Sequence, residues 1–464
     1  MIQAEQIWDV LVLGGGNAGL CAAITARKMG ASVLVVDAAP AFYRGGNTRH
    51  TRNFRVAHDD TNPILTGPYT EDEFWTDLQR VTKGRTDEAL ARLTISQSPQ
   101  LWEFFRAHGV RFQPALGGTL GLSKSNAFFL GGGRAMLNAL YASAESLGVV
   151  MAYDSEVVGL EIAGGEFRAA KIRKDGMEQR VEARALVAAA GGFEANIEWL
   201  KEYWGARAEN FHIRGTRYNR GGVLRLLLDS GVVSVGDPTQ CHAVAVDSRG
   251  PQFDGGIVTR LDCIPFGIVV DKNCRRFHDE GEDFWPKRYA IWGRLVADCP
   301  GQQAFVIFDS QSIRRFMPSL YPPAMADSIA GLANTLKLDA AALEKTVADF
   351  NAAVRPGHFD SAVLDDCRTE GLDPPKSHWA TQIIAAPYYA YPLSPGITFT
   401  YLGVKVDDAA RMQLAAGPAS NLFAAGEIMA GNVLGQGYVA GIGMTIGGVW
   451  GRVAGREAAR HAAG

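Results

Sequence analysis

Glycines near the start of the chain have a spacing that serves phosphate binding. Gly14, Gly16 and Gly19 form a G-x-G-x-x-G motif, and Asp37 follows at the separation found in dinucleotide folds. Such glycines permit a tight turn, close approach of the backbone to a pyrophosphate and close helix–strand packing. The N–H groups of a helix that begins in the turn bind phosphate oxygens, and the acid accepts hydrogen bonds from a ribose. The motif therefore predicts a dinucleotide site.

The segments on either side of the motif must hold it in place. Residues 7–13 are a short apolar run, residues 18–29 have a helical pattern, and residues 32–36 predict a second strand that ends at Asp37. This is the strand–turn–helix–strand order in which the motif binds nucleotides. A glycine-rich turn without a ligand is the alternative, and the complete set of elements favours nucleotide binding.

The motif alone does not separate NAD from FAD, and two further segments do. Residues 44–48 (Arg-Gly-Gly-Asn-Thr) follow Asp37 closely and are expected beside the rest of the dinucleotide. Residues 421–427 predict a strand that ends in Gly-Glu, before a glycine loop and a helix from about 443. The N-terminus of that helix is expected at the pyrimidine edge of a flavin, where its dipole stabilises the charge of the reduced ring. Together the two segments favour FAD.

Composition bounds the class of protein. With 464 residues the chain is too long for one ordinary core, so we expect two domains. A net charge of −3 offers no basic footprint for nucleic acid. No apolar run reaches the length of a membrane span and few residues precede the first strand, so we expect a cytoplasmic protein without a signal peptide. The six cysteines form no Cys-x-x-Cys pair, so we expect no metal site and a separate electron-accepting partner.

The remaining sequence divides into α/β segments and an insert. Residues 71–110 and 135–147 have helical patterns, and residues 155–190 alternate as strands do. Residues 242–395 differ, because they contain most of the later prolines together with aromatic and basic residues. We interpret them as an inserted second domain, after which the α/β pattern returns at Asn421.

These segments resemble the flavoprotein family of fumarate reductases, succinate dehydrogenases and ketosteroid dehydrogenases, and are most similar to the FAD-dependent tricarballylate dehydrogenases. The resemblance covers nearly the whole chain. Its most specific parts are residues 44–53 (RGGNTRHTRN), 125–133 (SNAFFLGGG), 189–193 (AAGGF), 281–293 (GEDFWPKRYAIWG), 395–402 (PGITFTYL) and 430–443 (AGNVLGQGYVAGIG). The fold it implies is α/β: a discontinuous Rossmann-like FAD-binding domain (1–241 and 396–464) with an inserted α+β capping domain (242–395).

The resemblance also implies a cofactor site, an activity and a partner. The implied FAD-binding residues are Gly14, Gly16, Asn17, Ala18, Gly19, Asp37, Gly45, Gly46, Asn47, Thr48, Gly191, Gly426, Glu427 and Gly441. The implied activity is oxidation of tricarballylate to cis-aconitate, by base removal of an α-proton and hydride transfer to flavin N5. The implied electron acceptor is a membrane-bound iron–sulfur protein, through which the chain would be peripheral at the inner membrane.

The resemblance places substrate-binding residues in the insert. His242, in the Gln-Cys-His segment that opens the capping domain, is the first candidate for binding a substrate carboxylate and is also a candidate catalytic residue; a packed core histidine is the alternative. Thr259 matches a threonine that holds substrate in fumarate reductases. Arg260 stands where that family has a glutamate; the change suits an additional substrate carboxylate, and a surface charge is the alternative.

The resemblance leaves the catalytic base open. An ungapped alignment puts Phe284 at the position of the proton-transfer arginine of fumarate reductases, and a short insertion makes Arg288 the equivalent. Arginine stays protonated in water, so it could act only with the help of nearby acids and burial. Tyr401 is the competing candidate. Lys287 and Thr400 complete the expected site.

Two departures from the family argue against fumarate or succinate as substrate. Phe399 occupies the position of a substrate-binding histidine, and Gln436–Tyr438 replace a carboxylate-binding arginine, which makes Tyr438 a further substrate-site candidate. Asn47, rather than His50, matches the histidine that links flavin covalently in succinate dehydrogenases, so we expect non-covalent FAD. Alternative substrates are another polycarboxylate, a corrinoid precursor or a 3-ketosteroid. A flavin-binding redox sensor without turnover is the alternative from another class.

Overall fold

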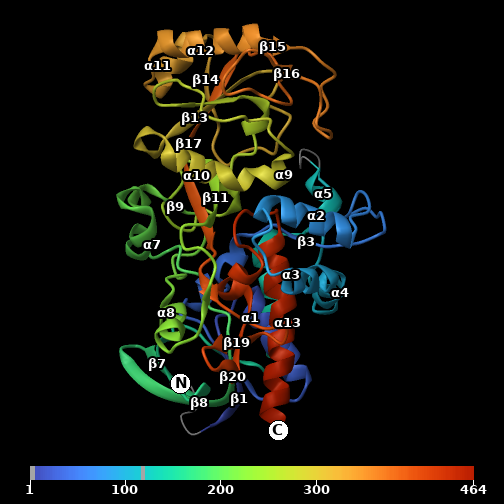
Figure 1. Ribbon diagram of the computed structural model, residues 1–464, viewed down its shortest axis with the longest axis vertical. Coiled ribbons are helices and arrows are strands. Elements are labelled where there is room, and N and C mark those ends of the chain that lie inside the picture. The colour runs from blue at the N-terminus through green and yellow to red at the C-terminus, as the bar shows by residue number, and fades with distance from the viewer. Residues whose placement is uncertain (1–5, 117–120) are drawn as a thin grey trace.

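The computed structural model describes residues 6–116 and 121–464. The molecule is elongated, with both described ends of the chain in its lower part and helices α11 (Ile329–Leu336) and α12 (Ala340–Ala353) at the top (Figure 1). The lower part is an α/β unit and the upper part is a second sheet covered by helices. The predicted α/β fold class is confirmed, since helices pack on sheets that contain parallel and antiparallel strands.

The lower part is built on a mostly parallel sheet. Its order is β19 (Arg411–Leu414), β20 (Gly417–Ala424), β8 (Met177–Ala188), β1 (Trp8–Leu13), β2 (Val33–Val36) and β5 (Val150–Ala152). Apart from β19, neighbouring strands are parallel. The central strands are buried on both faces, which explains their unbroken apolar runs. The strands β6 (Glu156–Ala163) and β7 (Glu166–Lys174) extend from β8 as an antiparallel ribbon.

Two helices far apart in sequence pack side by side against this sheet: α1 (Asn17–Lys28) and α13 (Ile442–Ala463). Three glycines of α13, four residues apart, face α1, and we call them the glycine seam: Gly447, Gly451 and Gly455. A side chain at Gly451 or Gly455 would overlap a backbone carbonyl of α1. The seam therefore brings the two helix backbones into contact.

Further elements surround the lower sheet. Helices there are α2 (Glu71–Thr82), α3 (Glu88–Ser96), α4 (Ser98–Ala107), α5 (Leu122–Ser125), α6 (Gly132–Ser146), α7 (Ile197–Trp204) and α8 (Gly222–Asp229). Short strands are β3 (Asn53–Arg55), β4 (Asn126–Phe128), β10 (Ser234–Val235) and β18 (Gly403–Val404), and the 3-10 helices are η1 (Ala41–Tyr43), η2 (Gly46–His50), η3 (Ala206–Asn210) and η8 (Gly426–Asn432). The N-terminal turns of α2 and α3 are capped by the side chains of Thr70 and Asp87.

The upper part is built on an antiparallel sheet in the order β11 (Cys241–Asp247), β17 (Tyr388–Thr400), β13 (Ala304–Asp309) and β12 (Ile268–Asp271). The strands β14 (Ala324–Ala326) and β9 (His212–Ile213) also pair with β17, and β15 (Val354–Arg355) pairs with β16 (Arg368–Thr369). The other elements of this part are α9 (Trp285–Arg288), α10 (Trp292–Asp298), η4 (Ile257–Thr259), η5 (Ile264–Phe266), η6 (Tyr289–Ile291) and η7 (Pro300–Gln302). A small apolar cluster lies between the sheet and α11 and α12.

The two parts meet along β17, the longest strand of the upper sheet. It runs through the predicted boundary at 395, and its last residues lie against the lower part. The strand β9, which precedes the predicted boundary at 242, joins the upper sheet by pairing with Gly396 and Ile397 of β17. The upper sheet therefore includes residues from outside the segment 242–395. The division of the chain into domains at these two boundaries remains a prediction.

Candidate active site

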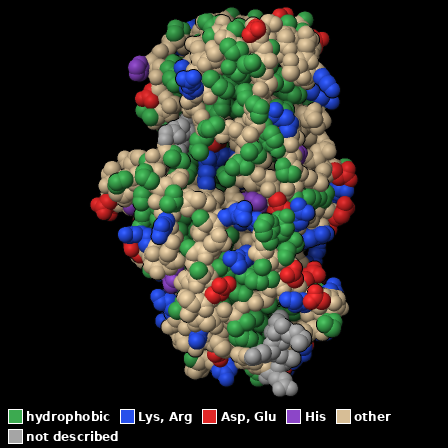
Figure 2. All heavy atoms as spheres, turned by 180° about the vertical axis from the view of Figure 1, so that it is seen from behind, with side chains coloured by type: hydrophobic (Ala, Val, Ile, Leu, Met, Phe, Trp, Pro, Cys, Tyr) green, Lys and Arg blue, Asp and Glu red, His purple; other side chains and the backbone are tan. Residues whose placement is uncertain are grey.

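A cavity of about 620 Å³ lies between the lower and upper parts. It is lined by the glycine turn, by η2, by the end of β17 and by the start of α13, together with residues of the upper part. Its volume falls in the range of ligand-binding cavities. Figure 2 shows Lys and Arg side chains around the middle of the molecule, where the two parts meet.

The glycine turn presents the N-terminus of α1 to this cavity. The N-cap residue of the helix is Gly16, which has no side chain that could cap it. The N–H of Asn17 donates to Thr48 Oγ1 at 3.0 Å. Uncapped N–H groups and the positive end of the helix dipole form a site for phosphate oxygens. A side chain at Gly19 would overlap the carbonyl oxygen of Gly14, so this glycine is required for the tight turn itself.

A second helix N-terminus, that of α13, opens into the same cavity. Its N-cap residue is Gly441, which has φ 83° and provides no side-chain cap. The N–H of Gly443 donates to Tyr438 Oη at 3.0 Å. Two positive helix ends therefore point at one cavity, as expected where a dinucleotide carries its pyrophosphate at one helix and a reducible ring at the other.

The predicted cofactor residues come together. Those that line the cavity are Gly14, Gly16, Asn17, Ala18, Asp37, Gly45, Gly46, Asn47, Thr48, Gly191, Gly426, Glu427 and Gly441. Gly19 lies behind them. Burial raises the pKa of Asp37, which accepts hydrogen bonds from the N–H groups of Gly15 and Ala39 at 3.2 and 2.9 Å. The volume, the two helix N-termini and the acid at the end of β2 fit FAD.

Asn47 joins the lower part to the upper sheet at the floor of the cavity. Its Nδ2 donates to Glu194 Oε1 at 2.5 Å and to the carbonyl of Thr398 at 2.6 Å, and its Oδ1 accepts from the N–H of Thr216 at 2.8 Å. Each polar atom of this amide is therefore used within the protein.

Two carboxylates, Glu194 and Glu427, share this floor. Glu194 Oε1 accepts from Asn219 Nδ2 at 2.9 Å, and Glu427 Oε1 accepts from the N–H of Thr400 at 2.8 Å. Burial raises the pKa of both acids, and the neighbouring Glu194 raises that of Glu427 further, well above its usual range. No Lys, Arg or His within residues 6–116 and 121–464 forms an ion pair with either acid. The pair therefore holds at least one proton at neutral pH.

The upper end of the cavity has the opposite charge. Three arginines line it, Arg52, Arg214 and Arg260, and the carboxylate beside them is Asp262. Asp262 lies 2.8 Å from Arg260 Nε and 3.3 Å from an Nη of Arg52. Three guanidinium groups around one carboxylate leave a formal excess of two positive charges.

Arg214 is the least satisfied of the three. Its Nη2 donates to Thr398 Oγ1 at 2.7 Å, whereas its buried Nε and Nη1 find no hydrogen-bond partner among the described residues. Burial and the charge of Arg260 lower the pKa of Arg214 to about 10. Burial alone would raise the pKa of Asp262, yet Arg260 and Arg52 hold it well below its usual range. The cluster therefore stays charged and has unused donors.

His242, on β11, lies between these arginines and two tyrosines. Its Nδ1 is 3.0 Å from Thr398 Oγ1, its Nε2 is 3.0 Å from Tyr289 Oη, and its ring stacks on Tyr438 with centroids 3.9 Å apart. Burial, together with Arg214 and Arg260, lowers the pKa of His242 well below its usual value. The imidazole is therefore neutral, and its role is to give or accept hydrogen bonds.

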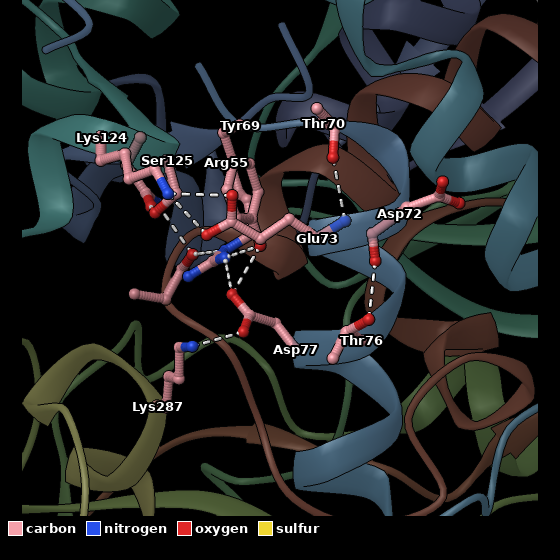
Figure 3. A network of polar contacts seen from close by, with 12 residues as sticks. Arg55, Tyr69, Thr70, Asp72, Glu73, Thr76, Asp77, Lys124, Ser125 and Lys287 are labelled. Carbon is pink, nitrogen blue, oxygen red and sulfur yellow. Dashed lines mark hydrogen bonds and ion pairs between the residues drawn. The ribbon is translucent and has the colours of Figure 1, made fainter. Parts of the chain in front are cut away.

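The structure places Arg288 and Lys287 outside the cavity, contrary to the sequence-based prediction. Arg288 faces the exterior, where its Nε is 2.9 Å from Glu282 Oε2. Lys287 reaches away to Asp77 of α2, with Nζ 2.5 Å from Oδ1 (Figure 3). Arg55 and the hydroxyl of Tyr69 also bind Asp77, at 3.2 and 2.8 Å from its Oδ2. Lys287 thus links the upper part to the lower part.

Three other predicted site residues also face elsewhere. Tyr401 is fully buried and its hydroxyl donates to the carbonyl of Gly437 at 2.6 Å. Thr259 donates to the carbonyl of Gly256 at 2.8 Å, within its own turn. Thr400 lies below the floor, beside Glu427. His242, Arg260 and Tyr438 do line the cavity.

Sequence reasoning missed Arg52, Arg214 and Tyr289. Arg52 and Tyr289 lie inside two segments that carried the family resemblance, 44–53 and 281–293. These segments do reach the cavity, but the sequence did not indicate which of their residues line it. Arg214 follows a two-residue strand in an irregular stretch, and no pattern around it distinguishes it from a surface arginine.

Comparison with known proteins agrees with this geometry. The family model described as "FAD binding domain" matches residues 9–444. A probable fumarate reductase of Shewanella frigidimarina is 27% identical over 478 residues, covering 98% of this chain and 75% of that protein. A 4-oxocyclohex-2-ene-1-carboxylate 5-dehydrogenase of Sinomonas cyclohexanicum is 30% identical over 366 residues, covering 71% and 60%.

The fold is shared with solved structures. The open conformation of a flavocytochrome c3 fumarate reductase matches with a TM-score of 0.76 at 23% identity, covering 99% of this chain and 79% of that one. Within the described ranges, none of the helices combines the length and apolar character of a membrane-spanning segment.

Proposed function

The chain belongs to the FAD-binding flavoprotein family of the fumarate reductases and succinate dehydrogenases, and on this premise we propose that it dehydrogenates a CH–CH bond of a polycarboxylate. It is an FAD-dependent oxidoreductase that acts on carbon–carbon bonds of unsaturated or carboxylate substrates. The proposed reaction is the conversion of tricarballylate to cis-aconitate.

One observation supports this substrate class above all: the excess of positive charge at the upper end of the cavity. Arg214 has two buried N–H-bearing nitrogens without a partner among the described residues, and Arg52 has one. A buried cation without a partner is costly, and a substrate carboxylate removes that cost. A substrate with several carboxylates matches the excess left by Arg52, Arg214 and Arg260 around Asp262.

The chain's own residues would bind and orient such a substrate. Arg214 and Arg260 clamp carboxylates, which holds charge close to the carbon from which a proton is lost. Tyr438 and Phe399 line the same end of the cavity and limit the access of water. When bound, FAD accepts the second hydrogen with its electron pair from the adjacent carbon.

The alternative substrates fit this charge less well. A 3-ketosteroid presents an apolar skeleton and one carbonyl, which would leave the arginines unpaired. A different polycarboxylate, or a corrinoid precursor with several acid groups, fits the arginine cluster and differs in shape. A redox sensor without turnover has no need of buried arginines over the cofactor.

A bleaching experiment tests the proposal. Anaerobic addition of tricarballylate to the FAD-loaded protein is expected to bleach the visible flavin absorbance within seconds, as follows from the roughly 1–10³ s⁻¹ turnover of ordinary enzymes. Succinate and a 3-ketosteroid are the comparison compounds. The polycarboxylate assignment fails if tricarballylate and other di- and tricarboxylates leave the flavin oxidised.

We also propose that FAD is held without a covalent bond, because Asn47 stands at the matching position and its amide is fully hydrogen-bonded to the protein. Acid precipitation is expected to leave the flavin in the supernatant. Yellow protein in the pellet would contradict this.

We propose further that a separate membrane-bound iron–sulfur protein takes the electrons. Washed membranes from the source cells are then expected to reoxidise the reduced enzyme faster than the soluble fraction does. Equal rates from both fractions would contradict a membrane-bound acceptor.

A further inference from the structure

The turn after α9 separates two neighbouring side chains. Trp285 begins this short helix and anchors it through a hydrogen bond from Nε1 to Asp262 Oδ1 at 2.7 Å, and Pro286 follows in its first turn. The chain then passes directly into η6. Arg288 points outward to Glu282, and Tyr289, which is 3% exposed, points into the cavity. This segment therefore contributes the phenol of Tyr289 to the cavity, and not the guanidinium of Arg288.

Tyr289 is held by a chain of hydrogen bonds that begins at Arg214. Arg214 Nη2 donates to Thr398 Oγ1, which lies 3.0 Å from His242 Nδ1, and His242 Nε2 lies 3.0 Å from Tyr289 Oη. The hydroxyl oxygen of Thr398 accepts a hydrogen bond from Arg214, so the hydroxyl hydrogen of Thr398 can be donated to His242 Nδ1. The neutral imidazole then carries its proton on Nε2 and donates it to Tyr289 Oη.

This arrangement orients the tyrosine. With Nε2–H donating to Oη, the hydroxyl hydrogen of Tyr289 is free to point at a ligand. The guanidinium of Arg260 lies 4.5 Å from the centroid of the Tyr289 ring. A phenolate at this position would be stabilised by an imidazole N–H and by nearby positive charge, without transfer of the proton to His242.

We propose that Tyr289 exchanges the proton with the substrate carbon and that His242 is its positioning residue, an inference that rests on the proposed function. In dehydrogenation the phenolate form of Tyr289, which has first released its own proton to solvent, acts as the base: the C–H bond beside a carboxylate breaks, its proton forms the O–H bond of Tyr289, and the electron pair forms the C=C bond. The hydrogen on the adjacent carbon leaves with its electron pair to FAD. In the reverse direction the phenol returns the proton and the electrons come from reduced FAD.

The charged groups around Tyr289 determine how the reaction depends on pH. Burial raises the pKa of Tyr289, and Arg260, Arg214, Arg52 and Arg55 partly oppose this. Other titratable groups that interact with it are His242, Tyr438 and Tyr401, and Asp262 pairs with the neighbouring Arg260. Because the raised pKa leaves the phenol protonated at neutral pH, the rate of dehydrogenation is expected to increase with pH across the stable range. The reverse reduction, which uses the phenol, should lack this rise.

The test compares three variants of the FAD-loaded protein. Tyr289→Phe removes one hydroxyl from the cavity, whereas Tyr401→Phe and Arg288→Gln alter the two residues that the sequence suggests as the base and that the structure places outside it. Each is mixed anaerobically with a panel of polycarboxylates, a keto-carboxylate and a 3-ketosteroid. Tyr289→Phe is expected to slow bleaching by about 10²-fold or more, the usual effect of losing general acid–base catalysis. Both controls should stay within a few-fold of the unaltered protein.

Binding and positioning need their own readouts. The dissociation constant of tricarballylate, measured from the shift of the flavin spectrum, should change less than about five-fold in Tyr289→Phe, and the rise of rate with pH should disappear. His242→Gln keeps an N–H donor near the position of Nε2 and should retain more activity than His242→Leu at an equal dissociation constant.

The outcomes separate this inference from the proposed function. If Tyr289→Phe bleaches within ten-fold of the unaltered protein, Tyr289 is not the proton-transfer group, whatever the substrate. If only the keto-carboxylate or the steroid bleaches the flavin, the polycarboxylate assignment fails and the comparison of variants proceeds with that compound. If nothing in the panel bleaches the unaltered protein, both proposals fail.

Discussion

Both ends of the cavity contain buried ionisable side chains, with acids at the floor and arginines at the upper end. The protein accommodates the two kinds of side chain in different ways. At the floor, Glu194 and Glu427 lie together without a cation from the described residues, and amide and backbone N–H groups bind them. At the upper end, Arg52 and Arg260 pair with Asp262, whereas Arg214 has no ion-pair partner among the described residues, and buried guanidinium nitrogens remain without hydrogen-bond partners.

The difference follows from the chemistry of the two side chains. A buried carboxylate can take up a proton and become neutral, so the floor needs no ligand to be tolerated. A buried guanidinium keeps its charge, because its pKa stays far above neutral even when lowered. The acidic floor can therefore be neutralised by a proton, although Glu194 Oε2 has no hydrogen-bond partner among the described residues, whereas the basic end is neutralised only by an anion.

Replacement of Arg214 should have the largest effect. Arg214→Met keeps the length of the side chain and removes its charge, so tricarballylate should bind more weakly by about 2–5 kcal/mol, the usual cost of losing one member of a buried charge pair. The same variant should unfold at a higher temperature without ligand, since an unpaired buried charge is lost. Titration of the flavin spectrum and calorimetry measure the two effects. Equal affinity would show that no substrate carboxylate reaches Arg214.

Replacement of Glu194 should have a smaller effect that depends on pH. Its folded-state pKa is raised, so the stability linked to its proton is fully present below the unfolded pKa of about 4.3 and is lost as pH rises toward the folded value. Stability should therefore fall as pH rises from about 4.3 to the raised pKa, and Glu194→Gln should flatten this fall. Denaturant unfolding over a pH series measures it. The exposed Glu344→Gln is the matched control, and an unchanged slope in Glu194→Gln would mean that the floor carries no extra proton.

Replacement of Lys287 should have the smallest effect. Lys287→Met removes the ion pair with Asp77, but Arg55 and Tyr69 still bind that carboxylate (Figure 3). The expected loss is about 1 kcal/mol of unfolding free energy, typical of one hydrogen-bonded contact, with substrate affinity within two-fold. A loss of affinity like that of Arg214→Met would place Lys287 at the substrate and remove the contrast between the two ends.

The cofactor half of the site could be predicted from sequence because it depends on backbone geometry. Gly14, Gly16 and Asp37 have fixed spacing along a strand–turn–helix unit, and Gly441 begins the helix that closes the cavity. Contacts of this kind are local in sequence, so a linear motif carries them.

The substrate half could be predicted only in part, because it depends on which way single side chains turn. Arg288 and Tyr289 are adjacent, yet Arg288 points outward and Tyr289 points into the cavity. An alignment of sequences does not tell which of two adjacent side chains faces the cavity. Arg214 reaches the site because β9 pairs with β17, a contact between segments far apart in sequence. His242 was predicted from its place at the start of the insert, and Arg260 from the family position that follows Thr259.

The glycine seam has a consequence for biosynthesis. It ties the helix that bears the dinucleotide turn to a helix at the far end of the sequence, and the cavity needs the N-termini of both. A ribosome produces the first helix long before the second. The complete cavity therefore forms only after the last helix has emerged and docked, although the glycine turn is synthesised among the first residues.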